Sequence, residues 1–516
     1  MFVQKQFSFK INGIPTIHSK SYNCVKKKII VLHLFFQGLF FVSHNVFSQD
    51  STQNNHNQQY VSLTGYGSTA RTPFWIRTNQ FATVPETSGL MIRAGSKNLF
   101  PIAQVQTPHL KAGYGIDLVA NMSTKSQVIL PELYGKVQFK KWEFYIGRKR
   151  ETVGLCDTLL GSGSYIWSGN ALPIPKIQLA IVDFLPLPFT KNLISFKGSY
   201  AHGWFGSGDF AYGYFLHQKS FYARIGKPTS QLRLYGGFNH QVQWGGKTYG
   251  DIGTVNNRTL PGSFRDYISV VTGFRNKGNS YFDSTNRIGN HLGTIDVGAE
   301  FEFRRMSLSV YRQSLFDDGS LARKEANNVA DGLQGIVLTF LYPERKKGQL
   351  SLKKALFELL YTKSQGGSTF DFEGGIFGRD NYFNHQQYFD GWSYKRRIIG
   401  TPFITNYRET NNSDDYNSNE IANNNRVVVY HFGFEGYYGE KLHFLSKLSY
   451  SLNYGTYGFP YETVPKQFSG LFQVDGQIGL WEGLEWNAAI ALDQGQLYTN
   501  TFGGKIGIRK TWSGKK

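Results

Sequence analysis

The sequence predicts an all-β fold, a transmembrane antiparallel β-barrel of about 18 strands. Aromatic residues make up 16% of the chain, with 42 Phe, 31 Tyr and 57 Gly, and this composition favours strands and turns over helices. Apolar and polar residues alternate along many segments. Beyond residue 48 no stretch approaches the roughly 18 uninterrupted apolar residues of a membrane-spanning helix. If this chain crosses a membrane, it therefore crosses with strands.

The first 48 residues have the features of a signal peptide. They contain six lysines and no acidic residue, and the run Lys26 to Lys28 precedes an apolar stretch from Ile29 to Val42. Val46 and Ser48 supply the small residues expected before a cleavage site, which we place after Ser48. A single transmembrane anchor is the alternative. It is disfavoured because the apolar core of roughly 14 residues is shorter than the ~20 that a spanning helix needs.

Behind this leader we expect a flexible segment, residues 49–58, and one outer-membrane barrel domain, residues 59–516. Cys156 is the only cysteine outside the leader, so no internal disulfide is expected. Without the leader lysines the net charge is about +14, which favours anionic partners such as lipopolysaccharide phosphates or an acidic glycan. Nucleic acid is not an expected partner, because an exported chain rarely meets it and no nucleic-acid-binding signature is present.

Alternation with a period of two identifies the wall strands. Every second residue from Ile295 to Phe303 is apolar, and the residues between them include Asp296 and Glu300, so the two kinds lie on opposite faces. The alternation recurs in a second segment, where one parity is shared by Phe444, Leu448, Tyr450, Leu452 and Tyr454. Further strands are expected at Leu133–Phe139, Trp142–Arg148, Lys191–Tyr200, Ser220–Ile225, Gln231–Phe238, Ile268–Phe274, Ser307–Gln313, Val427–Gly436 and Gly503–Trp512.

The connections carry further signals. Val474, Ile478 and Leu480 lead through a short turn to the alternating residues Trp486 to Leu492, which predicts a hairpin. The segment Thr410–Asn425 is rich in Asn and acidic residues and is expected to be a long loop on the outside. Two segments are candidate helices inside or under the barrel, although the second also fits a strand: Leu321–Leu333 and Leu350–Leu360.

Several strings, in this order along the chain, resemble the Wzi family of capsule assembly proteins. They span roughly Tyr60 to Trp392. The strings are Pro73-Phe-Trp-Ile-Arg-Thr-Asn-Gln80, Gly147-Arg-Lys149, Ser162-Gly-Ser-Tyr-Ile-Trp-Ser-Gly-Asn-Ala-Leu-Pro-Ile-Pro175, His217-Gln-Lys219, Gly237-Phe-Asn-His-Gln-Val-Gln-Trp-Gly-Gly246, Asp331-Gly332, Glu358-Leu-Leu-Tyr-Thr-Lys363, Asp380-Asn-Tyr-Phe-Asn-His385 and Gly391-Trp392.

This resemblance implies an outer-membrane barrel of about 18 strands whose lumen is occluded by minor helical or loop elements. It further implies a lectin that anchors capsular polysaccharide at the surface of a Gram-negative cell, without catalysis and without a cofactor. The chain has a longer lead-in and more aromatic residues than enterobacterial members, so the identity of the glycan does not transfer. We expect the protein to be a monomer.

The residues themselves fit glycan binding, since sugars stack on flat aromatic faces and their hydroxyls and carboxylates pair with amides and guanidinium groups. The alternative for each candidate is a structural role, either in a girdle at the membrane interface or in a polar network that holds the plug. The candidates are Trp75, Arg77, Asn79, Gln80, Arg148, Asn170, His217, Lys219, Asn239, His240, Gln243, Trp244, Arg379, Asp380, Asn381, Asn384, His385 and Trp392.

Two other functions are open at this point. One is a diffusion porin, and the other is an outer-membrane hydrolase in which Ser164 pairs with His217 or His240. The second is disfavoured because Pro173 and Pro175 prevent the helix that follows a nucleophile elbow. No metal site is expected, because no two of the candidate histidines have the close spacing of a metal-binding motif. These histidines are His202, His217, His240 and His385.

Overall fold

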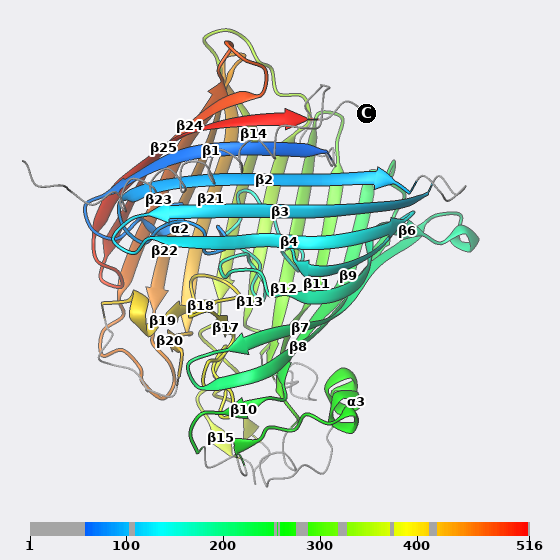
Figure 1. Ribbon diagram of the computed structural model, residues 1–516, viewed down its shortest axis with the longest axis vertical. Helices are drawn as coiled ribbons and strands as arrows, with labels where there is room; N and C mark the ends of the chain where they lie inside the picture. Colours follow the sequence, from blue (N-terminus) through cyan, green and yellow to red (C-terminus); the bar gives the residue numbers. More distant parts are fainter. Residues whose placement is uncertain are drawn as a thin grey trace, which may run out of the picture. The chain divides into compact units, whose positions relative to one another are not determined.

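The computed structural model describes residues 57–102, 109–251, 255, 258–274, 287–317, 328–371, 376–411 and 420–513. All of them except Ser513 belong to one compact unit, Asn54–Trp512. Within the described residues, eighteen long strands form one closed antiparallel barrel, which confirms the predicted fold class (Figure 1). The predicted signal peptide lies outside the described residues.

Each long strand pairs with the next long strand along the chain, and β25 pairs with β1 to close the barrel. A two-residue strand, β10 (Lys247–Thr248), adds to β8. The long strands are β1 Gln58–Ser68, β2 Gly89–Pro101, β3 Leu110–Met122, β4 Gln127–Phe139, β5 Trp142–Arg148, β6 Lys176–Pro186, β7 Ile194–Ser207, β8 Ala211–Ile225, β9 Leu232–Trp244, β11 Asn290–Glu302, β12 Met306–Asp317, β13 Gly332–Phe340, β14 Leu350–Tyr361, β21 Val427–Tyr438, β22 Leu442–Asn453, β23 Lys466–Gln477, β24 Leu484–Gly495 and β25 Thr501–Ser513.

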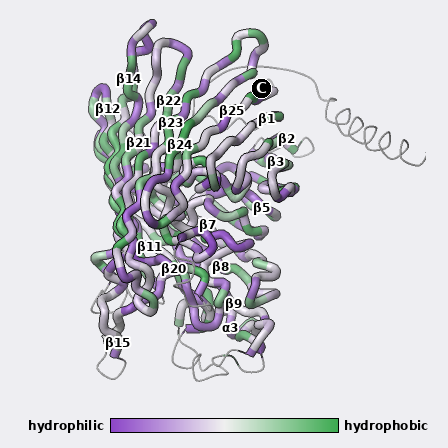
Figure 2. Tube along the Cα trace, turned by 90° about the vertical axis from the view of Figure 1, so that its left-hand side faces the viewer, coloured by the Kyte–Doolittle hydropathy of each residue, from purple (hydrophilic) through white to green (hydrophobic). Residues whose placement is uncertain are grey.

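The two faces of the wall differ as the alternation predicts. On β11 the side chains of Ile295 and Val297 are 44% and 53% exposed, whereas Asp296 between them is fully buried. Hydrophobic and hydrophilic residues alternate along the wall strands in Figure 2. Exposed apolar side chains on one face and buried polar ones on the other fit a barrel with an apolar exterior and a polar interior.

The connections differ in length between the two ends of the barrel. At one end, which we name the turn end, they are short: 102–109, 140–141, 187–193, 226–231, 303–305, 341–349, 439–441 and 478–483. The opposite end, the loop end, has the other nine connections, which include all of the longest ones: 69–88, 123–126, 149–175, 208–210, 245–289, 318–331, 362–426, 454–465 and 496–500. The predicted hairpin is confirmed, with its turn at 478–483.

Parts of three loop-end connections, 69–88, 149–175 and 362–426, fold into the barrel, and we call them the inner assembly. They contribute its fully buried side chains, among them Trp392, Tyr165, Phe74 and Leu160. The predicted occlusion of the lumen is therefore confirmed. Its short elements are α2 Phe74–Arg77, β17 Ser393–Tyr394, β18 Arg397–Ile398, β19 Thr405–Asn406, η4 Tyr407–Glu409 and β20 Ala422–Asn424. The pair β15 Phe370–Asp371 and β16 Ile376–Phe377 of the connection 362–426 lies beyond the wall at the loop end (Figure 1).

Polar side chains of the wall hold the inner assembly through its backbone. The N–H of Phe74 donates to the carboxylate of Asp493 at 2.7 Å, and the N–H of Leu155 donates to Asp296 at 2.8 Å. The N–H of Ser162 donates to Glu358 at 2.6 Å. Irregular backbone lacks the regular hydrogen bonds that a strand makes with its neighbours. These buried carboxylates supply the acceptors that its N–H groups need inside the barrel.

One predicted strand is wrong. Ile268–Phe274 lies mainly in a helix, α3 (Phe264–Thr272), in the connection after β9. Ser263 and Asp266 form a capping box at its start, and Gly273, with φ of 71°, ends it. These local signals outweigh the short alternation of Ile268 and Val270. No helix among the described residues is long and apolar enough to cross a bilayer.

The two candidate helices are also not helical where they are described. Leu350–Leu360 is strand β14, the alternative that the sequence left open. In Leu321–Leu333 the described residues form a turn and the start of β13. The predicted long loop Thr410–Asn425 belongs to the connection 362–426, and its described C-terminal part is buried as β20, which pairs with β19.

Candidate functional site

The predicted binding residues fall into two groups on opposite sides of the wall. His217, Lys219, His240 and Trp244 have the parity of the exposed Phe221 and Phe238 and face outward. The others belong to the inner assembly or face it, as listed: Trp75, Arg77, Asn79, Gln80, Arg148, Asn170, Asn239, Gln243, Arg379, Asp380, Asn381, Asn384, His385 and Trp392. The structure therefore does not bring all of them into one site.

Several inner residues make hydrogen bonds that hold the inner assembly together. The indole N–H of Trp392 donates to the carbonyl of Ile166 at 2.7 Å, and the Asn170 amide donates to Ile398 at 3.0 Å. The Gln243 amide donates from the wall to Gly391 at 2.8 Å. Asn239 donates to the hydroxyls of Tyr222 and Thr294, and the indole of Trp75 donates to Ser449. These buried groups direct their N–H groups to acceptors within the protein.

A second inner cluster surrounds Asn381 and Asn384. The Asn381 amide donates to Glu420 at 3.0 Å, and the Asn384 amide donates to the carbonyl of Ala422 at 2.9 Å. Asp380 accepts from Asn328 at 2.6 Å, while His385 Nδ1 accepts from the N–H of Gln387. Among the predicted residues only Gln80 and Arg379 are exposed. Glycan contact by the predicted residues stays a prediction.

An exposed cationic element of the inner assembly, just after Trp392, was not predicted from the sequence. Strands β17 and β18 form a hairpin whose two turn residues are Lys395 and Arg396, and both are exposed. We call Ser393–Ile398 the arginine hairpin. The φ angles of Lys395 and Arg396 are 50° and 65°, the left-handed values of a type I′ turn, which normally takes Asn-Gly. Strained backbone of this kind is concentrated at functional sites.

The signal for this hairpin in the sequence is the run Lys395-Arg396-Arg397 directly after Trp392-Ser-Tyr394. It gives neither a strand pattern nor a turn pair that favours a hairpin. Its importance comes from the cavity beside it, which has a volume of about 260 Å³. The cavity is lined by Phe205, Ser207, Gly208, Asp209, Tyr214, Asp390, Ser393, Tyr394, Lys395 and Arg396. Aromatic rings, carboxylates and cations therefore meet in one hollow at the loop end.

Asp390 and Asp209 fix the position of this cavity. The carboxylate of Asp390 accepts from the N–H groups of Asp209, Phe210 and Ala211, so the inner assembly is bound to the β7–β8 turn. Arg396 pairs with Asp209 at 2.8 Å, and Arg408 pairs with the other oxygen of Asp209 at 3.2 Å. The guanidinium of Arg396 is 65% exposed despite this pair, and is therefore accessible to a solute.

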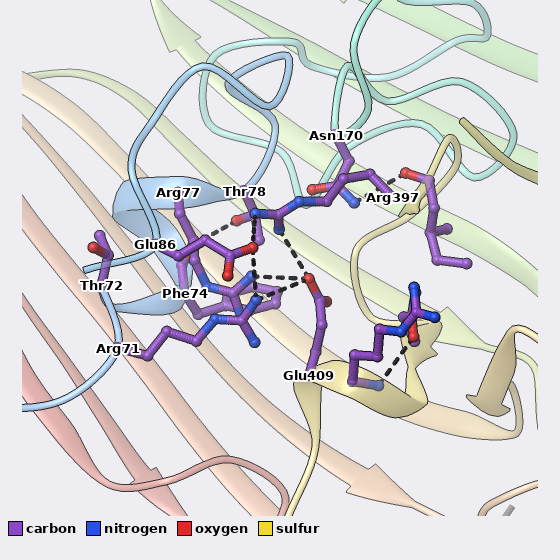
Figure 3. A network of polar contacts seen from close by, with 12 residues as sticks. Arg71, Thr72, Phe74, Arg77, Thr78, Glu86, Asn170, Arg397 and Glu409 are labelled. Atoms are coloured by element: carbon purple, nitrogen blue, oxygen red, sulfur yellow. Dashed lines mark hydrogen bonds and ion pairs between the residues drawn. The ribbon is translucent and has the colours of Figure 1, made fainter. Parts of the chain in front are cut away.

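Behind the arginine hairpin three arginines surround one glutamate, an arrangement that we call the Glu409 cluster (Figure 3). One carboxylate oxygen of Glu409 lies 2.8 Å from Arg397, 3.3 Å from Arg77 and 3.4 Å from Arg71. Arg397 and Arg71 also pair with Glu86. Arg77 is 3% exposed and Glu409 is 13% exposed, so the centre of the cluster is shielded from water.

The cations around the arginine hairpin outnumber the acids that they contact. The cations are Arg71, Arg77, Lys395, Arg396, Arg397 and Arg408, and the acids are Glu86, Asp209 and Glu409. Burial raises the pKa of Glu409, but the charges of the three arginines outweigh burial and hold it at about 2. Burial likewise raises the pKa of Asp209, and Arg396 and Arg408 reverse that effect and lower it. The acids therefore stay ionised, and the excess charge is positive.

The low pKa of Glu409 predicts how stability depends on pH. A group whose pKa is depressed by folding stabilises the fold above its ordinary pKa, here 4.5, and this contribution is lost as the pH falls toward about 2. We expect the difference in Tm between the protein and Glu409→Gln to be constant from neutral pH to about pH 5 and to shrink below it. Thermal unfolding in detergent at a series of pH values checks this. A difference that already vanishes near pH 6 would contradict it.

The arrangement does not support the hydrolase alternative. Ser164 is fully buried in the inner assembly, where its hydroxyl donates to the carbonyl of Val153 and lies 3.3 Å from Gln313. His217 and His240 face outward on the other side of the wall. Ser164 therefore has neither of its proposed bases, and no group of three or more metal-binding side chains occurs among the described residues. Cys156 is a free thiol, as expected.

Comparison with known proteins gives one family and one fold. The family model described as capsule assembly protein Wzi matches residues 31–410. An Escherichia coli structure described as Wzi, an outer membrane protein involved in group 1 capsule assembly and a carbohydrate-binding β-barrel, is 12% identical, with a TM-score of 0.54 over 88% of this chain and 84% of that one. No curated protein matches the sequence significantly.

Two other solved structures are less similar. Acinetobacter baumannii OccAB4 is 10% identical over 89% of this chain and all of its own length, with a TM-score of 0.44. Pseudomonas aeruginosa OccK3 is 9% identical over 89% of this chain and 95% of its own, with a TM-score of 0.42. The family match thus favours the function expected from the sequence over the diffusion porin.

Proposed function

Because the chain belongs to the Wzi family of capsule assembly proteins, we propose that it is an outer-membrane lectin that holds capsular or another anionic polysaccharide at the cell surface. It binds and does not turn over its ligand. The filled interior supports this proposal against free diffusion through the lumen, since the inner assembly occupies the barrel with fully buried side chains such as Trp392 and Tyr165.

The connection lengths orient the barrel in this proposal. Bacterial outer-membrane barrels have short periplasmic turns and longer extracellular loops. Both the start of β1 and the end of β25 lie at the turn end, which we therefore place in the periplasm. The loop end, with the arginine hairpin and its cavity, faces the outside. The same proposal includes the domain boundaries expected from the sequence, which are cleavage after Ser48 and one barrel from residue 59 to residue 516.

One observation carries the proposal. Two exposed cations, Lys395 and Arg396, are held at strained turn positions above a cavity lined with Tyr214 and Tyr394. Guanidinium groups bind carboxylates and phosphates through charge-assisted hydrogen bonds, and a polymer presents many such groups in sequence. Weak binding of one repeat at each protein then becomes durable attachment, because many copies of the protein engage one chain. The partners are the polysaccharide and the lipid and lipopolysaccharide around the wall, and we propose a monomer.

The predicted residues enter this proposal according to their exposure. Gln80 and Arg379 are the exposed members of the set and are proposed as direct glycan contacts. Arg77 and Arg148 act through other residues: Arg77 pairs with Glu409, and Arg148 donates to the hydroxyl of Tyr394 at 3.1 Å. The remaining inner residues position the assembly that carries the arginine hairpin.

Replacing Lys395 by Asn and Arg396 by Gly tests the proposal. Asn-Gly is the favoured type I′ pair, so the hairpin should remain folded while both charges are lost. We expect cells with this variant to shed most of their surface polysaccharide into the medium. The measurement is the ratio of cell-bound to soluble polysaccharide at equal amounts of surface-exposed barrel.

The matched control is Lys346→Ser with Lys347→Ser, which removes two exposed cations at the turn end. The control should retain polysaccharide like the unmodified protein. Equal retention by the hairpin variant and the unmodified protein would refute the proposed site. Equal shedding by both variants would show that total charge, and not the hairpin, determines retention.

A further inference from the structure

The helix α3 packs against the outer face of the wall. Val270 of α3 is fully buried in a small cluster with Val242, Trp244 and Ile288. The ring of Tyr267 lies 5.0 Å from that of Trp244, and the ammonium of Lys219 donates to the carbonyl of Val271 at the end of the helix. Val242, Trp244 and Lys219 have the parity of the exposed residues of their strands. The helix therefore covers a part of the exterior.

Beside this apolar contact, the exterior beneath α3 contains a polar patch. Four outward-facing histidines gather there on neighbouring strands: His202 on β7, His217 on β8, His240 on β9 and His291 on β11. His217 is fully buried, and His240 Nε2 lies 2.9 Å from His291 Nδ1. The ring of Tyr267 is 5.8 Å from that of His217 and 6.0 Å from that of His202. Without α3, these imidazoles would be exposed on the outside of the wall.

The histidines mark the border of the apolar exterior. On β8 the outward residues Ile225 and Phe221, nearer the turn end, are 48% and 46% exposed, and Lys219 and His217 follow them toward the loop end. On β9 the exposed Leu234 and Phe238 are followed in the same way by His240. Membrane barrels carry an apolar band that ends at the lipid–water interface. The helix α3 thus lies where this band ends, on the extracellular side.

The apolar surface of α3 is wider than the part that packs on the wall. At 100° per residue, Tyr267 and Val270 are adjacent on the helix to Phe264 and Ile268, but Phe264 is 79% exposed and Ile268 is 51% exposed. Phe274, just past the Gly273 cap, is 74% exposed. The hydroxyl of Tyr267 reaches that of Tyr200 at 2.8 Å, so this side of the helix is directed toward the apolar band.

The opposite side of α3 is polar, and two arginines lie on or near the helix. Arg265 is exposed there, and the guanidinium of Arg287 donates to the carbonyl of Gly273 at the C-terminus of the helix. The acidic residue of α3, Asp266, is engaged in the capping box with Ser263. A helix with an apolar side, a polar side and low overall hydrophobicity lies in the plane of a membrane interface.

We propose that α3 is an interfacial anchor that inserts Phe264, Ile268 and Phe274 among the acyl chains of the outer leaflet. Arg265 and Arg287 then lie at the level of the lipid phosphates, with which they interact. The anchor shields the polar histidine patch from lipid and fixes the depth of the loop end in the membrane. This inference rests on the proposed outer-membrane location and orientation, and it is independent of glycan binding.

Site-specific labelling tests the anchor. In the full chain with Cys24→Ser and Cys156→Ser, Ile268→Cys is labelled with an environment-sensitive nitrobenzoxadiazole fluorophore, and the barrel is inserted into phosphatidylethanolamine–phosphatidylglycerol vesicles. Phe459→Cys is the matched control, because Phe459 is an exposed apolar residue, 41% exposed, in the loop-end connection 454–465. Lipids that carry a nitroxide near the headgroup should quench the label at position 268 several-fold more than the label at position 459.

Equal quenching at the two positions would overturn the proposal, because α3 would then be in water. Protection of the label at position 268 from lipid quencher, together with a dimer in chemical cross-linking, would also overturn it, because a second copy would then cover the helix. The failures of the two proposals are distinguishable. If the hairpin variant retains its polysaccharide, the glycan site fails, but the stronger quenching at position 268 is unaffected. If quenching is equal at the two positions, the anchor fails, but the retention of polysaccharide is unaffected.

Discussion

Trp392→Ala is expected to release the inner assembly and open the barrel to ions. Trp392 is fully buried, its indole N–H donates to Ile166 at 2.7 Å, and its ring contacts those of Trp167 and Phe205. Removing a buried tryptophan costs about 3–5 kcal/mol, through lost burial and the cavity that remains. Because Trp392 joins the connection 362–426 to the connection 149–175, this loss falls on the contact between two parts of the inner assembly.

Two measurements check the expected release. Hydrogen exchange should speed up at the backbone amides around Ile166 and Ile399, whereas the wall strands remain protected. Planar bilayers should show frequent large-conductance openings that the unmodified barrel lacks. Trp481→Ala is the matched control, because Trp481 is 69% exposed in a turn and its loss should change stability by less than about 0.5 kcal/mol. If the Trp392→Ala barrel showed as few large-conductance openings as this control, Trp392 would not hold the inner assembly in place.

Glu409→Gln is expected to destabilise the loop end by about 3 kcal/mol, because it leaves buried positive charges without their partner. Arg77 is 3% exposed and has Glu409 as its ion-pair partner, while Arg71 and Arg397 keep Glu86. The amide of glutamine is nearly the same size as the carboxylate, so the change removes charge and little volume. The measurement is the denaturant midpoint, followed by proteolysis of the connections 69–88 and 362–426.

The control is Glu344→Gln at the turn end, where Glu344 is 69% exposed and pairs with Lys346 at 2.6 Å. Exposed pairs of this kind contribute about 0–1 kcal/mol, so the control should resemble the unmodified protein. If Glu409→Gln had as small an effect as the control, the three arginines would be solvated in the protein and the Glu409 cluster would not be a buried network.

The wall could be predicted from the sequence because the alternation that identifies a wall strand depends only on neighbouring residues. Each strand exposes one face to the outside, so the alternation from Ile295 to Phe303 fixes both the strand and the direction of its side chains. The strand Trp142–Arg148 was predicted with its observed bounds. The exception, Ile268–Phe274, has three apolar residues at even positions, but its capping box makes it a helix.

The site was harder to predict because the interior is filled by connections in which apolar and polar residues follow no regular period. Trp75 and Trp392 look like sugar-stacking residues in the sequence, yet both are buried and donate their indole N–H groups within the protein. Only the fold shows that the connections holding them are inside the barrel. The arginine hairpin was missed for a similar reason, since a type I′ turn made of Lys395 and Arg396 contradicts the residue preference on which a turn prediction relies.

Closure of the wall by β1 and β25 imposes an order on biogenesis. The N–H of Phe74, just after the first strand, reaches Asp493 on β24, and the N–H of Thr69 reaches the carbonyl of Phe502 on β25. The first inward connection thus has part of its binding surface only after the last strands have emerged. The interior and the seam are therefore completed together at the end of folding, and a chain truncated before β24 can neither seal the wall nor bind this connection.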